Sequence, residues 1–329
     1  MKETNWGIIG PGSIARDFAN DLQYASPGQR VVAVLGNHAD STTKFAKEFA
    51  VPGNYTGLES FLADENIEAV YIATPHPHHF AQALACLEKK IPVLCEKPMT
   101  INTAQAGQLV SAAKKNQTFL MEGMWIRFLP SVQLALSLIA TDRIGKIISI
   151  KASMGYKAPA DPESRYFDPE LGGGSLLDLG IYPVFLSCLL LGKPNTIKAI
   201  GTLSEAGVDE TCAMLFQYSS GQHASLESSL LSQSDLPAEI IGEKGTIKIL
   251  NPWFEKSKGI ELITEEHGKT VYPCEWEGHG LYYEVQEVLR CLENEKIESE
   301  LMSHSFSLDM IQVMDEIRKQ INVTYEMYE

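Results

Sequence analysis

The pattern of apolar positions divides the chain into two parts. Up to about residue 121, short apolar runs alternate with stretches of helical periodicity. The apolar runs span residues 4–9, 30–35, 70–74, 91–95 and 118–121, and the helical stretches span about 14–22, 79–90 and 103–116. Alternating strands and helices predict an α/β fold with a doubly wound parallel sheet, whose ligands bind beyond the carboxyl ends of the strands.

The second part, after a helical connector at about 131–140, consists mainly of longer strand-like runs joined by short turns. These runs span about 146–156, 196–203, 210–218, 222–231, 238–241 and 246–250, with helices expected at about 175–191, 281–293 and 305–320. Strands without intervening helices predict an antiparallel sheet. We therefore expect two domains: residues 1–122 with the parallel Rossmann sheet, and residues 123–329 forming an α+β domain with a large, mostly antiparallel open sheet.

A glycine motif, Gly10-x-Gly12-x-x-Ala15, follows the first apolar run directly. At such a strand-to-helix turn, Gly10 permits the tight turn and Gly12 lets the backbone approach a pyrophosphate. The helix that follows offers unpaired N–H groups and a positive dipole end. The motif therefore predicts a dinucleotide site, and the alternative is a glycine turn that holds no ligand.

The charge balance excludes some partners. The formal net charge is −15, from 27 basic and 42 acidic residues, and no basic stripe is present. We expect neither nucleic-acid binding nor binding to anionic membranes. No run approaches the ~20 apolar residues of a membrane span, and the amino terminus lacks a signal-peptide core, so we expect a cytoplasmic protein. The six cysteines lie far apart without Cys-x-x-Cys pairs, which indicates buried thiols.

Two segments carry residue types suited to proton transfer at a hydroxyl group. Lys97, in Cys95-Glu-Lys-Pro98, follows an apolar run and so is expected at the carboxyl end of a strand. Asp178 and Tyr182 are four residues apart at a helix start, and Gly180 and Pro183 should distort that helix. A tyrosine, with an unperturbed pKa of ~10, becomes a useful base beside an ammonium group such as that of Lys97. The alternatives are a surface lysine, a helix-start aspartate and a core tyrosine.

Two further segments are candidates for contacts with a cofactor or substrate. His76-Pro-His-His79 follows the strand ending at Thr74, and we expect a loop in which His76 or His79 donates hydrogen bonds to the cofactor. No Cys, Asp or Glu cluster accompanies these histidines, so we expect no metal site. Trp125 and Arg127 lie where the two parts join and can line a pocket, or they merely pack an interface.

Taken in order, five motifs resemble the glucose-fructose oxidoreductase, inositol dehydrogenase and rhizopine catabolism (Gfo/Idh/MocA) family. They are Gly-Pro-Gly-Ser-Ile-Ala, Ala-Thr-Pro-His-Pro-x-His, Cys-Glu-Lys-Pro-Met, Trp-x-Arg-Phe-x-Pro and Leu-Gly-Gly-Gly-Ser-Leu-Leu-Asp-Leu-Gly-Ile-Tyr. The resemblance is strongest to the branch of glucose-fructose oxidoreductase and dimeric dihydrodiol dehydrogenase. It implies Lys97 as the catalytic lysine, Tyr182 as the acid/base and Asp178 as a residue orienting hydroxyl groups. It also implies a homodimer or larger homo-oligomer, formed through the open sheet.

The end of the second strand bears on the choice of cofactor. An NAD site calls for an acidic residue there to hold the ribose 2′-hydroxyl, and this chain has Leu35-Gly-Asn-His38. Small neutral residues leave room for a 2′-phosphate, so NADP is favoured and NAD is the alternative. The expected cofactor-binding set is Gly10, Gly12, Ser13, Ile14, Asn37, His38, Thr74, His76, His79, Glu96, Lys97, Trp125 and Arg127.

These observations favour an NADP-dependent dehydrogenase that moves hydride between the nicotinamide and a carbinol carbon of a sugar, polyol or cyclic trans-diol. The alternative is a dinucleotide-binding metabolite sensor without turnover, because a cofactor motif alone demands no chemistry. A methyltransferase that uses S-adenosylmethionine would share the glycine turn but not the antiparallel second part.

Overall fold

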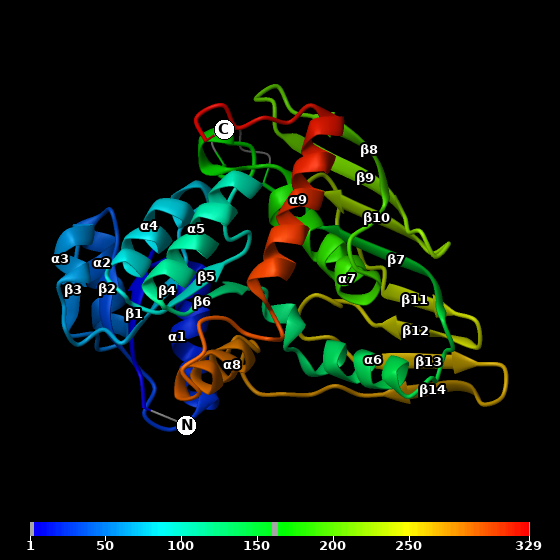
Figure 1. Ribbon diagram of the computed structural model, residues 1–329, viewed down its shortest axis with the longest axis horizontal. Helices are drawn as coiled ribbons and strands as arrows, with labels where there is room; N and C mark the ends of the chain where they lie inside the picture. Colours follow the sequence, from blue (N-terminus) through cyan, green and yellow to red (C-terminus); the bar gives the residue numbers. More distant parts are fainter. Residues whose placement is uncertain (1–2, 160–163, 329) are drawn as a thin grey trace. The chain divides into compact units, whose positions relative to one another are not determined.

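The computed structural model describes residues 3–159 and 164–328 (Figure 1). The chain forms two compact units, called here unit 1 and unit 2. Unit 1 consists of Met1–Trp125 and Glu277–Leu308, and unit 2 of Ile126–Trp276 and Asp309–Glu329. Our expected single division after residue 122 corresponds to the first passage between units, and does not include the return of residues 277–308 to unit 1.

Unit 1 contains a six-stranded parallel sheet in the order β3-β2-β1-β4-β5-β6. Its strands are β1 (Asn5–Ile9), β2 (Arg30–Leu35), β3 (Gly53–Tyr55), β4 (Ala69–Ile72), β5 (Val93–Glu96) and β6 (Leu120–Gly123). Its helices include α1 (Ser13–Ala25), α2 (Ala39–Glu48), α3 (Leu58–Leu62), α4 (His76–Glu88), α5 (Thr103–Asn116) and α8 (Tyr282–Glu293). The strand order reverses between β1 and β4, so the predicted doubly wound sheet is confirmed.

The strands of unit 1 are covered on both faces, which explains their nearly continuous apolar runs. Ile8, Val34, Val70 and Leu94, from four neighbouring strands, are fully buried. Packing also favours glycine at position 7 on β1, because a Cβ on Gly7 would lie 2.7 Å from the ring of Phe61.

Unit 2 contains an eight-stranded sheet in the order β14-β13-β12-β11-β7-β10-β9-β8 (Figure 1). Its strands are β7 (Ile147–Gly155), β8 (Thr196–Leu203), β9 (Asp209–Gln217), β10 (His223–Ser229), β11 (Ala238–Gly242), β12 (Gly245–Ile249), β13 (Ile260–Thr264) and β14 (Gly268–Tyr272). All neighbours are antiparallel except β7 and β10, which are parallel. The expected large, mostly antiparallel sheet is therefore confirmed, and β13 and β14 extend it beyond the predicted strands.

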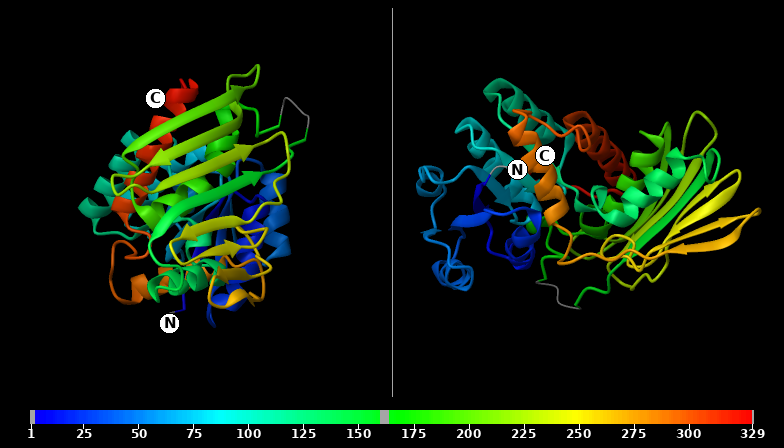
Figure 2. Two further views of the ribbon diagram at one scale, coloured as in Figure 1. Left: turned by 90° about the vertical axis from the view of Figure 1, so that its right-hand side faces the viewer. Right: turned by 90° about the horizontal axis from the view of Figure 1, so that it is seen from below.

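The helical segments of unit 2 lie on one face of this sheet (Figure 2). They are η1 (Trp125–Arg127), which begins in unit 1, α6 (Pro130–Ala140), η2 (Pro169–Leu171), the π-helix η3 (Leu176–Gly180), α7 (Ile181–Leu191) and the greater part of α9 (His304–Ile321). The run Pro169–Leu191 is long and apolar enough to cross a membrane by length and composition alone, which our sequence expectation did not foresee. Most of it is buried, as in a core helix.

The opposite face of the unit 2 sheet exposes apolar side chains. Ile200 on β8 and Leu215 on β9 are 76% and 50% exposed, and Leu236, just before β11, is 63% exposed. These residues line a shallow hollow of about 740 Å³ over the middle of the sheet. The open face expected for an antiparallel sheet is therefore present, and it carries these apolar side chains among charged ones such as Lys151 and Glu227.

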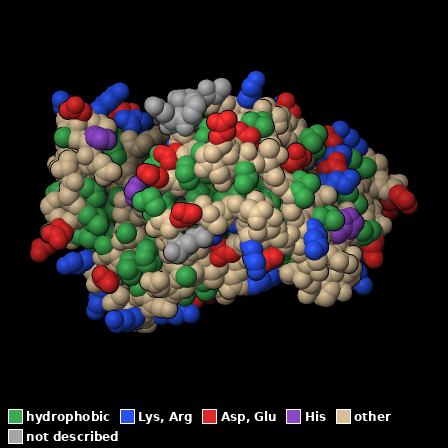
Figure 3. Space-filling view, turned by 90° about the horizontal axis from the view of Figure 1, so that it is seen from above, with side chains coloured by type: hydrophobic (Ala, Val, Ile, Leu, Met, Phe, Trp, Pro, Cys, Tyr) green, Lys and Arg blue, Asp and Glu red, His purple; other side chains and the backbone are tan. Residues whose placement is uncertain are grey.

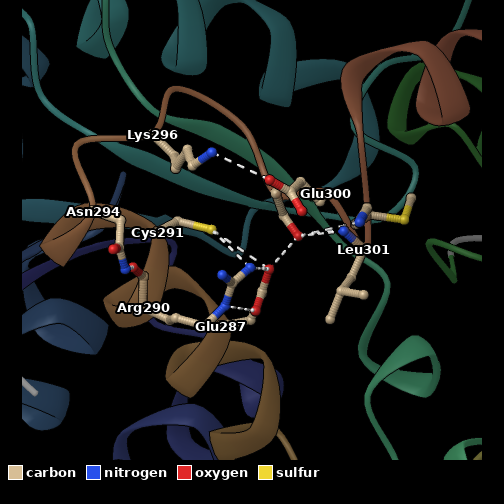
Figure 4. A network of polar contacts seen from close by, with 9 residues as sticks. Glu287, Arg290, Cys291, Asn294, Lys296, Glu300 and Leu301 are labelled. Atoms are coloured by element: carbon tan, nitrogen blue, oxygen red, sulfur yellow. Dashed lines mark hydrogen bonds and ion pairs between the residues drawn. The ribbon is translucent and has the colours of Figure 1, made fainter.

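Within unit 1, a polar network fixes α8 to the segment that follows it (Figure 4). Glu287 accepts two parallel hydrogen bonds from the Arg290 guanidinium, at 2.7 and 2.8 Å, and a third contact from Cys291. Lys296 pairs with Glu300 at 3.2 Å in the same segment. All six cysteines, Cys291 included, are free and buried, as the sequence predicted.

On the face of the molecule shown in Figure 3, basic side chains occur in small groups separated by acidic and neutral ones. Among the described residues drawn there, these groups are small for a surface that would follow a phosphate backbone.

Candidate functional site

The turn after β1 forms a phosphate cradle. Gly10 has φ +96°, and a Cβ there would lie 2.8 Å from the Ala73 carbonyl group at the end of β4. A Cβ on Gly12, by contrast, would meet only the Ala73 oxygen, at 4.0 Å. Gly12 is the N-cap of α1 and no side chain caps this helix, so the first N–H groups, including that of Ser13, face outward without a side-chain partner. These features fit a dinucleotide pyrophosphate.

The second strand ends at Leu35, where we expected it to end. Asn37 and His38 follow and are exposed, and Asp40 lies two positions further, in the first turn of α2. Arg16 lies beside this region, where its guanidinium donates to the Pro11 carbonyl at 3.0 Å and pairs with Glu48 at 3.2 Å. No carboxylate therefore stands directly at the strand end.

The histidine segment after β4 is the first turn of α4 and not the loop we expected. His79 is fully buried, and its ring nitrogens lie 2.8 Å from the Pro98 carbonyl oxygen and 2.7 Å from that of Thr74. Both nitrogens face backbone carbonyls, so His79 joins the segments after β4 and β5, and a neutral ring donates to one of these two carbonyls. Burial lowers the pKa of His79 to about 4, so its ring is neutral at pH 7. His76 is also buried, with its ring 6.0 Å from that of His79.

The segment after β5 brings Glu96 and Lys97 to the same edge of the sheet. Glu96 ends the strand and accepts a hydrogen bond from the Tyr71 hydroxyl at 2.5 Å and one from the Lys97 backbone N–H at 3.2 Å. Burial, together with the charge of Glu96, raises the pKa of Tyr71 well above its usual value. Glu96 is thus occupied by neighbours in unit 1, while Lys97 is half-buried at the strand end, as predicted.

At the end of β6, the short helix η1 carries Trp125 and Arg127. Arg127 is buried, and its backbone carbonyl accepts a hydrogen bond from the Gln133 side chain. Trp125 is half-buried. The two residues lie on either side of the first passage of the chain between the units.

In unit 2, Asp178 and Tyr182 lie on a continuous helical run that changes type between them. Asp178 is the third residue of η3, where the N–H of Ile181 donates to the carbonyl of Leu176, five residues earlier. Tyr182 follows on α7, with its ring 6.2 Å from that of Phe254. The distortion expected from Gly180 and Pro183 is confirmed as this π-helix, an insertion that often occurs at functional sites.

Sequence reasoning missed Arg165 as a partner of this segment. Its guanidinium lies 3.4 Å from the Asp178 carboxylate and 4.4 Å from the centre of the Tyr166 ring. Burial opposes the charge of Arg165, but Asp178 and Tyr166 outweigh it and raise the pKa of the arginine. A single arginine in an irregular segment gives no spacing signal, so nothing in the sequence pointed to it.

Among the residues that the structure describes, no group of three or more His, Cys, Asp or Glu side chains could hold a metal ion. The candidates thus fall into two sets. The carboxyl edge of the unit 1 sheet collects the cofactor candidates from five strand ends, and the η3–α7 run of unit 2 holds Asp178 and Tyr182.

Comparisons with known proteins agree with both parts of this architecture. Residues 4–124 match the model described as an oxidoreductase family with an NAD-binding Rossmann fold, and residues 132–248 match the GFO/IDH/MocA C-terminal domain. A trans-1,2-dihydrobenzene-1,2-diol dehydrogenase from Sus scrofa is 35% identical over 328 residues, which cover 97% of each chain.

Two solved structures share the fold. The aldose-aldose oxidoreductase from Caulobacter crescentus, crystallised with glycerol, superposes with a TM-score of 0.88 at 20% identity over 98% of each chain. A 3-ketoreductase from Actinomadura kijaniata, in complex with NADP and TDP-benzene, gives a TM-score of 0.84 at 22% identity, covering 97% of this chain and 98% of that one.

The fold and the matches define an oxidoreductase with a nicotinamide-dinucleotide-binding Rossmann domain. The chain belongs to the GFO/IDH/MocA family.

Proposed function

We propose that this protein is an NADP-dependent dehydrogenase that oxidises a carbinol carbon of a cyclic diol, sugar or polyol, or reduces the corresponding carbonyl. The observation that carries the proposal is the combination, in one family member, of an uncapped glycine cradle after β1 and a lysine at the carboxyl end of β5. The diol dehydrogenase that is 35% identical over nearly the whole chain supports a vicinal diol as the substrate class.

The residues of unit 1 hold the cofactor in this proposal. The N–H groups at the start of α1, beside Gly10 and Gly12, bind the pyrophosphate, and Thr74 and His76 border the same edge of the sheet. When bound, the nicotinamide accepts or supplies the hydride. Unit 1 is thus the cofactor-binding part, while unit 2 supplies the substrate side.

Tyr182 and Lys97 act together on the substrate hydroxyl group. The Tyr182 hydroxyl exchanges this proton, and the ammonium of Lys97 lowers the tyrosine pKa and stabilises the developing alkoxide. The mostly apolar setting of Tyr182, 7% exposed and beside Phe254, strengthens any such charge interaction because it excludes water.

Asp178 orients a second hydroxyl group of the substrate. Its carboxylate is buried but for 9% of the residue surface and lies beside Arg165, which balances its charge. A carboxylate accepts hydrogen bonds from hydroxyl donors, and a guanidinium donates to oxygen acceptors, so the pair suits a polyhydroxylated ring. Arg127 adds a second fixed cation for the same purpose.

The end of β2 favours NADP over NAD. Asn37 and His38 are uncharged residue types at exposed positions, and they leave space for a 2′-phosphate, for which Arg16, His38 or Lys44 is the partner. The apolar face of the unit 2 sheet, with Ile200, Leu215 and Leu236, supports a homodimer formed through that face.

The test of the mechanism is turnover by Lys97→Met and Tyr182→Phe, followed through nicotinamide absorbance with a panel of cyclic diols, sugars and polyols. Each variant should lower kcat by roughly 10²–10⁴-fold, as expected for a lost acid/base group, while the Kd for NADP changes little. Lys89→Met and Tyr24→Phe, both at exposed positions of unit 1, are the matched controls.

Wild-type turnover in both variants would refute the assigned roles. If the wild-type protein binds NADP and a ligand of the panel but never changes the redox state of the cofactor, the protein is a metabolite sensor instead.

A further inference from the structure

Asp209 is a buried carboxyl group that joins β9 to the start of the π-helix η3. It is the first residue of β9, and its side chain is inaccessible to solvent. Its Oδ2 accepts a hydrogen bond from the Ser175 hydroxyl at 2.7 Å and one from the Leu176 backbone N–H at 2.7 Å. Because the first N–H groups of a helix have no partner within it, the carboxylate stabilises this end of η3.

The glycines before η3 make room for this carboxyl group. Gly174 has φ +114°, and a Cβ there would lie 2.5 Å from Oδ1 of Asp209. The Ser175 hydroxyl also lies 2.9 Å from that of Ser228 on β10, and Tyr325 donates to the Gly173 carbonyl at 2.6 Å. The carboxyl group on β9 therefore contacts the helix start directly, and Ser175 links it to Ser228 on β10.

We infer that Asp209 is a positioning residue of the reaction, which fixes the π-helix that carries Asp178 and leads into Tyr182. The inference rests on the proposed function, because it requires those two side chains to act on the substrate. Asp178 lies two residues after Leu176, and Tyr182 lies six residues after it on the same run. A change at the anchored end therefore moves both.

The charge of Asp209 is sensitive to pH near neutrality. Burial raises the pKa of Asp209 to about 7, and the hydrogen bonds from Ser175 and Leu176 oppose a further rise. The carboxylate accepts both hydrogen bonds when ionised, whereas a protonated carboxyl group has lost part of this accepting capacity. Anchoring of η3 therefore weakens as the pH falls through about 7.

We assign this titration to Asp209 and not to the groups around it. On its own strand, burial first and Asp209 second raise the pKa of Cys212 to about 12, so this thiol is neutral. The Tyr325 hydroxyl also lies close to Gly174, and the Arg318 guanidinium lies 5.3 Å from the centre of the Tyr325 ring. Arg318 is paired with Asp315 at 2.7 Å.

The inference is tested by kinetics of Asp209→Ala, Asp209→Asn and Ser175→Ala, with Ser187→Ala as the matched control. Ser187 is equally buried on α7 but bonds with Tyr218, away from η3. Losing hydrogen bonds to a charged group predicts a kcat lower by roughly 10–100-fold in Asp209→Ala and by roughly 5–10-fold in Ser175→Ala, with the Kd for NADP unchanged. Asp209→Asn keeps an oxygen acceptor without the charge, as protonated Asp209 does, so its kcat at pH 8 should lie between the values for wild type and Asp209→Ala.

The pH profile separates positioning from a general loss of structure. Wild-type kcat should fall below pH 7 more steeply than that of Asp209→Asn, which cannot titrate. Wild-type kcat and an unchanged pH profile in both Asp209 variants would overturn the inference.

A second measurement does not depend on turnover. Amide hydrogen exchange in the segment 173–182 should become roughly tenfold faster or more in Asp209→Ala, rise less in Asp209→Asn and stay near wild type in Ser187→Ala. Equal exchange in Asp209→Ala and wild type would refute the anchoring. A wild-type protein that turns over nothing while this exchange pattern holds would refute only the proposed function.

Discussion

The carboxylate of Asp21 on α1 accepts the backbone N–H of Gly280 at 2.7 Å, across 259 positions of the chain. The same carboxylate accepts the N–H groups of His279 and Leu281, at 2.8 and 2.9 Å. These are the residues directly before α8, so Asp21 provides the N-terminal cap that α8 lacks in its own sequence. It thereby fixes the returning segment of unit 1 to α1.

Asp21→Ala should destabilise the protein by roughly 3 kcal/mol, because it leaves buried N–H groups without an acceptor. Asp21→Asn keeps one oxygen acceptor and should cost about 1 kcal/mol. Urea unfolding at neutral pH measures both values, with Glu88→Ala, at an exposed position of α4, as the control. Equal stability of Asp21→Ala and wild type would contradict the role of the cap.

Asn37→Asp should shift the cofactor preference toward NAD. A carboxylate at the end of β2 binds the ribose 2′-hydroxyl and repels a 2′-phosphate, so the ratio of the Kd values for NAD and NADP should fall by roughly tenfold or more. Titration of each dinucleotide, followed by tryptophan fluorescence, gives the ratio. Asn37→Ser is the neutral control, and an unchanged ratio in Asn37→Asp would place the discriminating contacts elsewhere.

His79 should make the fold sensitive to mild acid. The pKa of His79 is lowered from 6.5 to about 4 in the folded protein. The unfolded chain therefore binds more protons between these values, and the stability contributed by the neutral ring is fully present above pH 6.5 and lost as the pH falls toward 4. The difference amounts to roughly 3 kcal/mol.

Unfolding free energies at pH 7, 6 and 5 measure this loss. His79→Gln should show a shallower decline with acid than wild type, whereas His267→Gln, at an exposed position beside β14, should decline as wild type does. Identical slopes for wild type and His79→Gln would mean that the ring does not carry the acid sensitivity.

Ile200→Lys combined with Leu215→Lys should break the proposed homodimer. Both side chains lie on the exposed face of the unit 2 sheet, and buried lysines there would lose hydration. Light scattering should give a particle of 36.3 kDa for the variant and about twice that mass for wild type. Leu301→Lys, an exposed position in unit 1, should leave the mass unchanged. A wild-type particle of the monomer mass would refute the dimer.

The strand and helix pattern of the chain was largely readable from local sequence, because periodicity reports which side of an element is buried. The doubly wound order, the glycine cradle and the distortion near Gly180 all follow from such local signals. The strand β3 was not predicted, because its three residues, Gly53–Tyr55, are too few to show a period. The parallel pairing of β7 with β10 depends on contacts far apart in the chain, which local patterns do not encode.

Side chains that act through distant partners were the least predictable part of the site. His79 has the residue type of a cofactor contact, but only the structure shows that each of its ring nitrogens lies against a backbone carbonyl oxygen. Asp209 lies 34 positions from its partner Ser175, and Arg165 has no motif around it. The sequence therefore indicated the residues with chemistry, and much less of what holds them in place.

The two units alternate along the chain, because the last segment of unit 1 is Glu277–Leu308 and that of unit 2 is Asp309–Glu329. During synthesis, the Rossmann core consequently stays without α8 until residue 293 has been added. Completion of unit 1 is therefore a late event, although its glycine motif is made among the first residues.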